Sequence, residues 1–198
     1  MIQPRYLRNL YAVSEAQQAL LAERAILVVG CGGLGGYVIE QLARFGVGCI
    51  RVVDPDGFEE TNLNRQLLAS MLNLGKPKVA AAQARLQAIN PLVRVDAVQE
   101  HFTTDTAPSL LSGAHLVVDA LDTIPARLLL QQAAAQAGLP LVHGALAGWR
   151  GQVCVVRPGE DLLSQLYPDP AACQGEEVEQ GALAFSVGLV ASLMASEA

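Results

Sequence analysis

A glycine-rich turn between an apolar run and a helical pattern constrains the fold of this chain most. Residues 26–46 read ILVVGCGGLGGYVIEQLARFG. Gly30, Gly32 and Gly35 fit the pattern G-x-G-x-x-G, in which the first glycine permits a tight turn, the second lets a phosphate approach the backbone, and the third lets the helix pack closely on the strand. The helix N-terminus adds N–H donors and a partial positive charge. The turn predicts a nucleotide site, and its default ligand, when it is taken alone, is NAD.

Strand and helix patterns alternate along the rest of the chain. This order predicts an α/β fold with a Rossmann-like, doubly wound, mostly parallel sheet. We expect an added antiparallel edge from RGQVCVVRP, a crossover loop over about 158–181, and a final helix after it. The chain is expected to be one domain, 1–198, with an N-terminal helical arm in 1–24. Strands are expected at 25–30, 49–54, 93–99, 114–121 and 140–148, and helices at 14–25, 34–45, 75–89 and 125–138.

Composition excludes several classes of protein. The 198 residues, 52% apolar and 5% aromatic, suit one α/β domain of Leu/Ala helices on Val/Ile strands. A net charge of −6 argues against broad binding to nucleic acid or to an anionic membrane. No apolar run reaches the length of a membrane span and residues 1–20 lack a signal-peptide core, so we expect a cytoplasmic protein. The four cysteines form no C-x-x-C pair, which predicts neither a structural zinc site nor a disulfide framework.

A polar cluster, DPDGFEETNLNRQ (54–66), follows the second predicted strand and favours ATP over NAD. Asp54 ends that strand, where a carboxylate can hold ribose hydroxyls, and Asp56 is a second acid beside it. Cations near a nucleotide neutralise triphosphate charge and stabilise the charge that develops as a phosphoryl bond breaks. A solvated loop is the alternative interpretation of these residue types. The candidates for phosphate contacts are Asn62, Arg65 and Lys78.

A further acid, Asp122, comes just past the fourth predicted strand, at the edge where doubly wound sheets bind ligands. It is well placed to hold Mg²⁺ on phosphate oxygens. Arg127 is then either its salt-bridge partner or a phosphate contact, and an exposed ion pair is the alternative. Asp119 lies inside the strand and is expected to be a structural polar partner, and His143 is expected to be structural as well.

Seven segments together resemble the ThiF/MoeB/HesA family, relatives of the adenylation domain of ubiquitin-activating enzymes. They span nearly the whole chain, and N-L-N-R-Q followed by G-x-P-K is far more specific than the glycine turn. In order they are RYLRN, VVGCGGLGG, VVDPDGFEETNLNRQ, GKPKVAAAQARLQAINP, VVDALDTIPAR, PLVHGALAGWRGQV and EQGALAFSVGLVAS.

The resemblance implies an adenylyltransferase. Such proteins bind ATP and adenylate the C-terminal glycine of a ubiquitin-like sulfur-carrier protein ending in Gly-Gly, with release of pyrophosphate, in thiamine, molybdopterin or related sulfur pathways. It implies ATP and Mg²⁺ as cofactors and a homodimer. The resemblance implies that the backbone passes beneath the nucleotide at Gly30, Gly32, Gly33 and Gly35, and that Asp54 holds the ribose. It implies phosphate contacts from Asn62, Arg65 and Lys78. It also implies that Asp122 holds Mg²⁺ and that Arg8 reaches into the partner subunit's site.

The chain also departs from the family pattern. Where many members carry the first zinc-binding C-x-x-C pair, this chain has LLSQLYP, so the crossover loop is expected to hold its shape without zinc. Cys173 is the one candidate for the thioester or persulfide chemistry of some members, although its acidic neighbours would raise the pKa of its thiol. Three other functions stay open: adenylation of another acceptor such as a tRNA base carboxylate or a peptide, a non-catalytic nucleotide-binding scaffold, and an NAD oxidoreductase.

Overall fold

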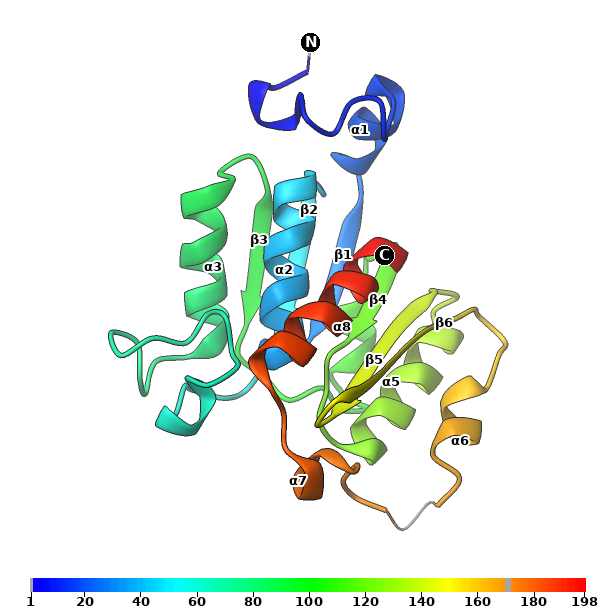
Figure 1. Cartoon of the computed structure of the whole chain (residues 1–198). Helices are drawn as coiled ribbons and strands as arrows, with labels where there is room; N and C mark the ends of the chain where they lie inside the picture. The colour runs from blue at the N-terminus through cyan, green and yellow to red at the C-terminus, as the bar shows by residue number, and fades with distance from the viewer. Residues whose placement is uncertain (1, 170–171) are drawn as a thin grey trace.

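A six-stranded sheet forms the centre of the molecule, and the computed structural model describes residues 2–169 and 172–198. The strand order is β3-β2-β1-β4-β5-β6, in which only β6 runs antiparallel to its neighbour (Figure 1). This confirms the predicted mostly parallel sheet with an antiparallel edge. The strands are β1 (Ala25–Val29), β2 (Cys49–Val53), β3 (Arg94–Val98), β4 (Leu116–Asp119), β5 (Leu141–Ala147) and β6 (Arg150–Val156).

Helices cover both faces of the sheet, which is why the central strands are apolar at almost every position. Ile26 and Val28 of β1 belong to one buried cluster, and Leu27 and Val29 to the other. In Figure 1, α2 and α8 lie side by side over the first of these faces. Helices α2 (Gly33–Phe45), α3 (Lys78–Ile89) and α8 (Ala184–Glu197) pack on the first face, and α4 (Ala107–Leu111), α5 (Ile124–Gln136) and α6 (Leu162–Leu166) on the second.

The N-terminal arm lies at the amino ends of the strands. It contains the 3-10 helix η1 (Pro4–Tyr6) and α1 (Glu15–Leu21), which Ser14 caps as predicted. Asn90, just after α3, donates to the Tyr6 hydroxyl at 2.7 Å and to the Ala43 carbonyl at 2.7 Å. The arm is therefore fastened to the C-terminal ends of α2 and α3.

Three predictions about the bounds of elements are wrong. The helix expected at 14–25 ends at Leu21, because the Arg24 carbonyl already accepts from the Cys49 amide at the start of β2. The helix expected from residue 75 begins at Lys78, and Pro77 is its N-cap instead of a residue of its first turn. The amide of Lys78 donates to the Asp56 carbonyl at 2.9 Å, which holds the start of α3 against the polar cluster. The crossover segment (residues 158–181) is also not a loop throughout, because it contains α6 and α7 (Glu177–Gln180). Within the described residues, no helix is both long and apolar enough to cross a bilayer.

Candidate active site

The glycine turn packs directly against the end of β4. Gly30 has a φ of 98°, in the left-handed region, and a Cβ there would collide with the carbonyl of Ala120. A Cβ on Gly35 would in turn collide with the Gly30 carbonyl. Only glycine fits these two positions, so β1, the turn and α2 come close enough to place the N-terminus of α2 at the carboxyl edge of the sheet.

Asp54 organises the residues that follow β2. Its two carboxylate oxygens accept hydrogen bonds from the backbone amides of Cys31, at 2.7 Å, and Asp56, at 2.9 Å. Burial raises the pKa of Asp54 from its ordinary value, and these amides and the Lys78 ammonium limit the rise. Lys78 is itself buried, with Nζ 3.0 Å from Asp56 Oδ2 and 3.9 Å from Asp54 Oδ1. The Lys78 ammonium therefore lies beside two carboxylates at the carboxyl end of β2.

A cavity of about 670 Å³ opens here, where the strand order reverses between β1 and β4. Doubly wound sheets bind their ligands at this switch point. Carboxylates, cations and glycine backbone all meet in its wall. The sequence-predicted residues that line it are Gly30, Gly32, Gly33, Asp54, Asp56, Arg65, Lys78, Asp122 and Arg127.

Four predicted residues lie outside this wall. Gly35 is behind the turn, against Gly30. Asn62 is buried and its Oδ1 accepts from the Glu59 amide at 3.0 Å, which closes the 3-10 helix η2 (Glu60–Asn62). Cys173 is exposed, and its carbonyl accepts from the Ile124 amide at 3.2 Å, at the start of α5.

Arg8 is the fourth of these residues. It is exposed on the N-terminal arm, where the neighbouring Asn9 contacts the Phe45 carbonyl at the end of α2. The 13 residues of α2 separate this point from the glycine turn, a distance of about 20 Å along the helix axis. Arg8 is thus at the opposite edge of the sheet from the cavity of its own chain.

Sequence reasoning missed two features of the site. Gln66 lines the cavity and is 7% exposed, yet its Oε1 receives no hydrogen bond within the described part of the chain. The motif N-L-N-R-Q contained it, but no pattern predicts the direction of an amide. Asn64 also lines the cavity, with its Oδ1 accepting from Arg65 Nη1 at 2.8 Å.

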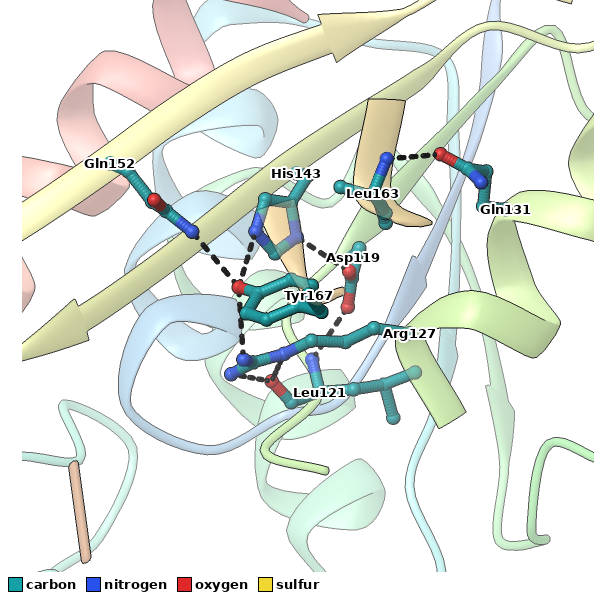
Figure 2. A network of polar contacts seen from close by, with 8 residues as sticks. All are labelled: Asp119, Leu121, Arg127, Gln131, His143, Gln152, Leu163 and Tyr167. Atoms are coloured by element: carbon teal, nitrogen blue, oxygen red, sulfur yellow. Dashed lines mark hydrogen bonds and ion pairs between the residues drawn. The ribbon is translucent and has the colours of Figure 1, made fainter. Parts of the chain in front are cut away.

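The second missed feature is a buried polar network beside the cavity, shown in Figure 2. His143 Nδ1 lies 2.7 Å from Asp119 Oδ2 and its Nε2 lies 3.0 Å from the Tyr167 hydroxyl. Asp119 is therefore the structural partner that the sequence predicted. Arg127 donates through Nε and Nη2 to the Leu121 carbonyl, at 3.1 and 2.9 Å, and through Nη1 to Tyr167.

A second cavity, of about 510 Å³, adjoins the first. Its wall combines the β5–β6 hairpin with the crossover segment, including Tyr167, Pro168 and residues 174–176. Arg127, Ala145 and Leu146 line both cavities. The two spaces therefore meet beside these three residues.

The donor set fits a magnesium ion held together with a nucleotide. Among the described residues, no group of three or more His, Cys, Asp or Glu side chains is placed to hold a metal ion alone. Mg²⁺ is usually held by one or two carboxylates plus substrate phosphates and waters. The exposed carboxylate of Asp122 in the cavity wall is of that kind.

Two curated proteins similar to this chain are named as adenylyltransferases. The sulfur carrier protein adenylyltransferase of Thermus thermophilus is 40% identical over 190 residues, which cover 91% of this chain and 70% of the relative. The molybdopterin-synthase adenylyltransferase of Salmonella typhimurium is 37% identical over 190 residues, covering 93% of this chain and 74% of the relative.

A solved structure of a protein with a different name shares the fold. The AMP complex of the E. coli tRNA N6-threonylcarbamoyladenosine dehydratase, TcdA, has a TM-score of 0.79 and 25% identity over the whole of this chain and 94% of its own. The ThiF family matches residues 6–198. Since this match covers almost the entire sequence, the chain belongs to the ThiF family.

Proposed function

We propose that this chain is an ATP-dependent adenylyltransferase that activates the C-terminal glycine of a ubiquitin-like sulfur-carrier protein. The observation that carries the proposal is the meeting of Arg65, Lys78 and Arg127 around one cavity with the glycine turn and Asp54. The cations suit the charge of a nucleoside triphosphate, and the glycine turn leaves room for its phosphates. The relatives named as sulfur-carrier and molybdopterin-synthase adenylyltransferases support the same class of acceptor.

The reaction needs alignment more than it needs a base. A C-terminal carboxylate is ionised at neutral pH, so it can attack the α-phosphorus of ATP directly. The new bond joins the carboxylate oxygen to the α-phosphorus, and the bond from that phosphorus to the bridging oxygen of pyrophosphate breaks. Catalysis then consists of holding the reactants in line and stabilising the charge on pyrophosphate.

The side chains around the cavity divide this work. Asp54 would hold the ribose hydroxyls, and the amides at the start of α2 would face the phosphates. Lys78 would exchange Asp56 for a phosphate oxygen, and Arg65 would leave the Thr61 carbonyl and Asn64 that now hold its Nη1. Asp122 would hold Mg²⁺, which when bound neutralises charge on the phosphate oxygens.

The second cavity is the proposed path of the carrier tail. It reaches the first cavity beside Arg127, Ala145 and Leu146, and the crossover segment forms part of its wall. A tail that ends in two glycines carries no side chains to obstruct a narrow passage. Its terminal carboxylate would also carry the charge that Arg127 attracts.

We further propose a homodimer in the cytoplasm, in which Arg8 reaches the partner's cavity. Arg8 lies at the wrong edge of the sheet to serve its own site. Helix α8 also exposes an apolar row, in which Phe185, Leu189 and Leu193 are 59%, 65% and 51% exposed and follow each other at four-residue spacing. A second copy of the chain would cover this row.

Carrier-dependent ATP–pyrophosphate exchange tests the proposal, with Mg²⁺ and a panel of small carriers that end in Gly-Gly. We expect exchange with one carrier, whose identity assigns the thiamine, molybdopterin or related pathway. Arg65→Ala and Asp122→Ala should each lower exchange by roughly two or more orders of magnitude. Arg157→Ala is the matched control, because Arg157 is exposed and follows β6, whose end pairs with the start of β5, away from the cavity.

The same assay separates the alternatives. Normal exchange in both site variants would refute the assigned site. Cys173→Ala should retain exchange, and a loss would give the crossover cysteine a part in adenylation. ATP binding without exchange would indicate another acceptor, such as a tRNA base carboxylate or a peptide, or a scaffold. Binding of NAD in place of ATP would indicate a nicotinamide nucleotide site.

A further inference from the structure

Tyr167 occupies the centre of the network in Figure 2. It follows α6 in the crossover segment, and its hydroxyl lies 3.1 Å from Arg127 Nη1, 2.9 Å from Gln152 Nε2 and 3.0 Å from His143 Nε2. The arginine and amide nitrogens can only donate, so the hydroxyl oxygen accepts both and gives its own hydrogen to His143. His143 Nδ1 then carries a hydrogen that it donates to Asp119. The network has one consistent pattern of donors and acceptors.

The other end of the network holds the turn after β4. Asp119 Oδ1 accepts from the Leu121 amide at 3.0 Å, and the Leu121 carbonyl accepts from Arg127 Nε and Nη2 at 3.1 and 2.9 Å. Both backbone polar groups of Leu121, the residue before Asp122, are therefore fixed by the network. Asp119 and His143 are 0% exposed and Arg127 is 3% exposed, and hydrogen bonds at such depth are costly to leave unmade.

A separate anchor holds the start of α6. The Leu163 amide donates to Gln131 Oε1 at 2.8 Å, and Gln131 Nε2 donates to Asp161 Oδ1 at 2.7 Å. This anchor does not involve Tyr167. Removing the Tyr167 hydroxyl should thus loosen the C-terminal end of α6 and the chain after it, while the start of α6 stays attached.

We propose that Tyr167 is a positioning residue that couples the crossover segment to the nucleotide cavity. Arg127 lines both cavities, Asp122 lines the first and Tyr167 the second. A nucleotide that orders the Leu121–Asp122 turn would, through Arg127 and Asp119, order the crossover segment over the second cavity. By linkage, an occupant of the second cavity strengthens nucleotide binding by the same factor. The inference rests on the proposed function only in taking the first cavity as the ATP site.

Hydrogen exchange of backbone amides in Tyr167→Phe tests this coupling, because phenylalanine keeps the ring and removes the hydroxyl. Without ligand, exchange over 164–169 and 120–123 should rise by about tenfold above the native chain. With saturating ATP and Mg²⁺, the native chain should exchange more slowly in both segments, and the variant only in 120–123. Tyr37→Phe is the matched control, since the Tyr37 hydroxyl makes no hydrogen bond among the residues described; it should behave as the native chain.

Each outcome bears on the inference. Unchanged ligand-free exchange in Tyr167→Phe would show that the Tyr167 hydroxyl does not hold the crossover segment. ATP protection of 164–169 that persists in the variant would overturn the coupling. Gln152→Ala removes one hydrogen-bond donor to Tyr167 from an exposed side chain, and it should give a smaller increase of exchange over 164–169. This variant replaces Tyr167→Phe if that variant fails to fold. No increase in Gln152→Ala would then show that the Tyr167 hydroxyl does not hold the crossover segment. If ATP protects neither segment of the native chain, the proposed function fails. The ligand-free comparison then still shows whether the Tyr167 hydroxyl holds the crossover segment.

Discussion

Gln66 is a buried side chain in the wall of the first cavity, and its carbonyl oxygen lacks a hydrogen-bond donor within the described ranges. A Cβ built on Gly32 would lie 3.4 Å from Gln66 Nε2, so the amide lies against the glycine turn. An unpaired buried polar group lowers stability, because it has lost water without gaining a partner. Such a group is expected at a site where a ligand, once bound, provides the partner.

Gln66→Leu should therefore separate stability from binding. We expect the free energy of unfolding to stay the same or rise by up to about 1 kcal/mol, since no hydrogen bond is lost. Affinity for ATP should fall by about tenfold. Denaturant unfolding and titration calorimetry measure the two effects. Gln132→Leu, on the exposed side of α5, should change neither. A destabilised Gln66→Leu that binds ATP normally would contradict a role at the site.

Single residues of the site were predictable where a local pattern fixed them. The glycine turn and Asp54 follow from spacing around one strand–turn–helix unit, and Lys78 is predicted from the polar cluster after the second strand and from the family resemblance. Gly30, Gly32, Gly33, Asp54 and Lys78 all line the cavity. The sequence could not tell which asparagine of N-L-N faces the cavity, because η2 turns Asn62 back onto Glu59 and leaves Asn64 at the wall. Nor could it join Arg127 to Tyr167, which are 40 residues apart.

Between elements, Glu40 holds α2 to α3. The carboxylate lies 2.7 Å from Arg44 Nη2 on its own helix and 2.8 Å from Arg85 Nε on α3. Burial alone would raise the pKa of Glu40, but the hydrogen bonds from Arg85 and Arg44 outweigh it and leave the pKa below its ordinary value. The ionised glutamate therefore stabilises the fold.

Glu40→Gln should lower stability in a pH-dependent way. Because the pKa is lower in the folded chain, the stabilisation is complete above the ordinary glutamate pKa and is lost as pH falls through the folded value. We expect a loss of about 1 kcal/mol at pH 7, since both arginines are about half exposed, and a smaller difference below about pH 4. Urea unfolding across this range measures it, with the exposed Glu23→Gln as control. A difference that stays constant with pH would exclude the ion pairs as its cause.

Elements were predictable according to their length. The strands, which have four to seven residues, and the long helices α2, α3, α5 and α8 carry enough pattern to be recognised. Helices α4, α6 and α7 have five, five and four residues, which is little more than one turn. Their formation depends on tertiary contacts, such as the complete burial of Leu163 against α5, and these do not appear in a local pattern.

At the scale of the whole molecule, the position of Arg8 predicts that two different inactive variants can restore activity when they form a dimer with each other. Arg8→Ala and Arg65→Ala should each be inactive in pyrophosphate exchange, yet a dimer of one with the other should contain one complete site. Random pairing makes half of the dimers mixed, with one of two sites intact, so co-expression should restore about a quarter of native activity.

Native mass spectrometry should show the mixed dimer in that preparation. Each variant expressed alone is the control and should stay inactive. Mixed dimers without recovered activity would show that Arg8 does not complete the partner's site, and monomers throughout would contradict the proposed dimer itself.

Apart from Arg127, Ala145 and Leu146, the two cavities are lined by different residues. The charged side chains proposed to hold the nucleotide all precede residue 128, while the second cavity is built mostly from residues 145–176. Nucleotide chemistry and choice of acceptor can therefore change separately, except where Tyr167 and Gln152 contact the network around Arg127. Substitutions in the later stretch that keep Tyr167 and Gln152 offer evolution, or an engineer, a route to a new acceptor that leaves the proposed nucleotide site intact.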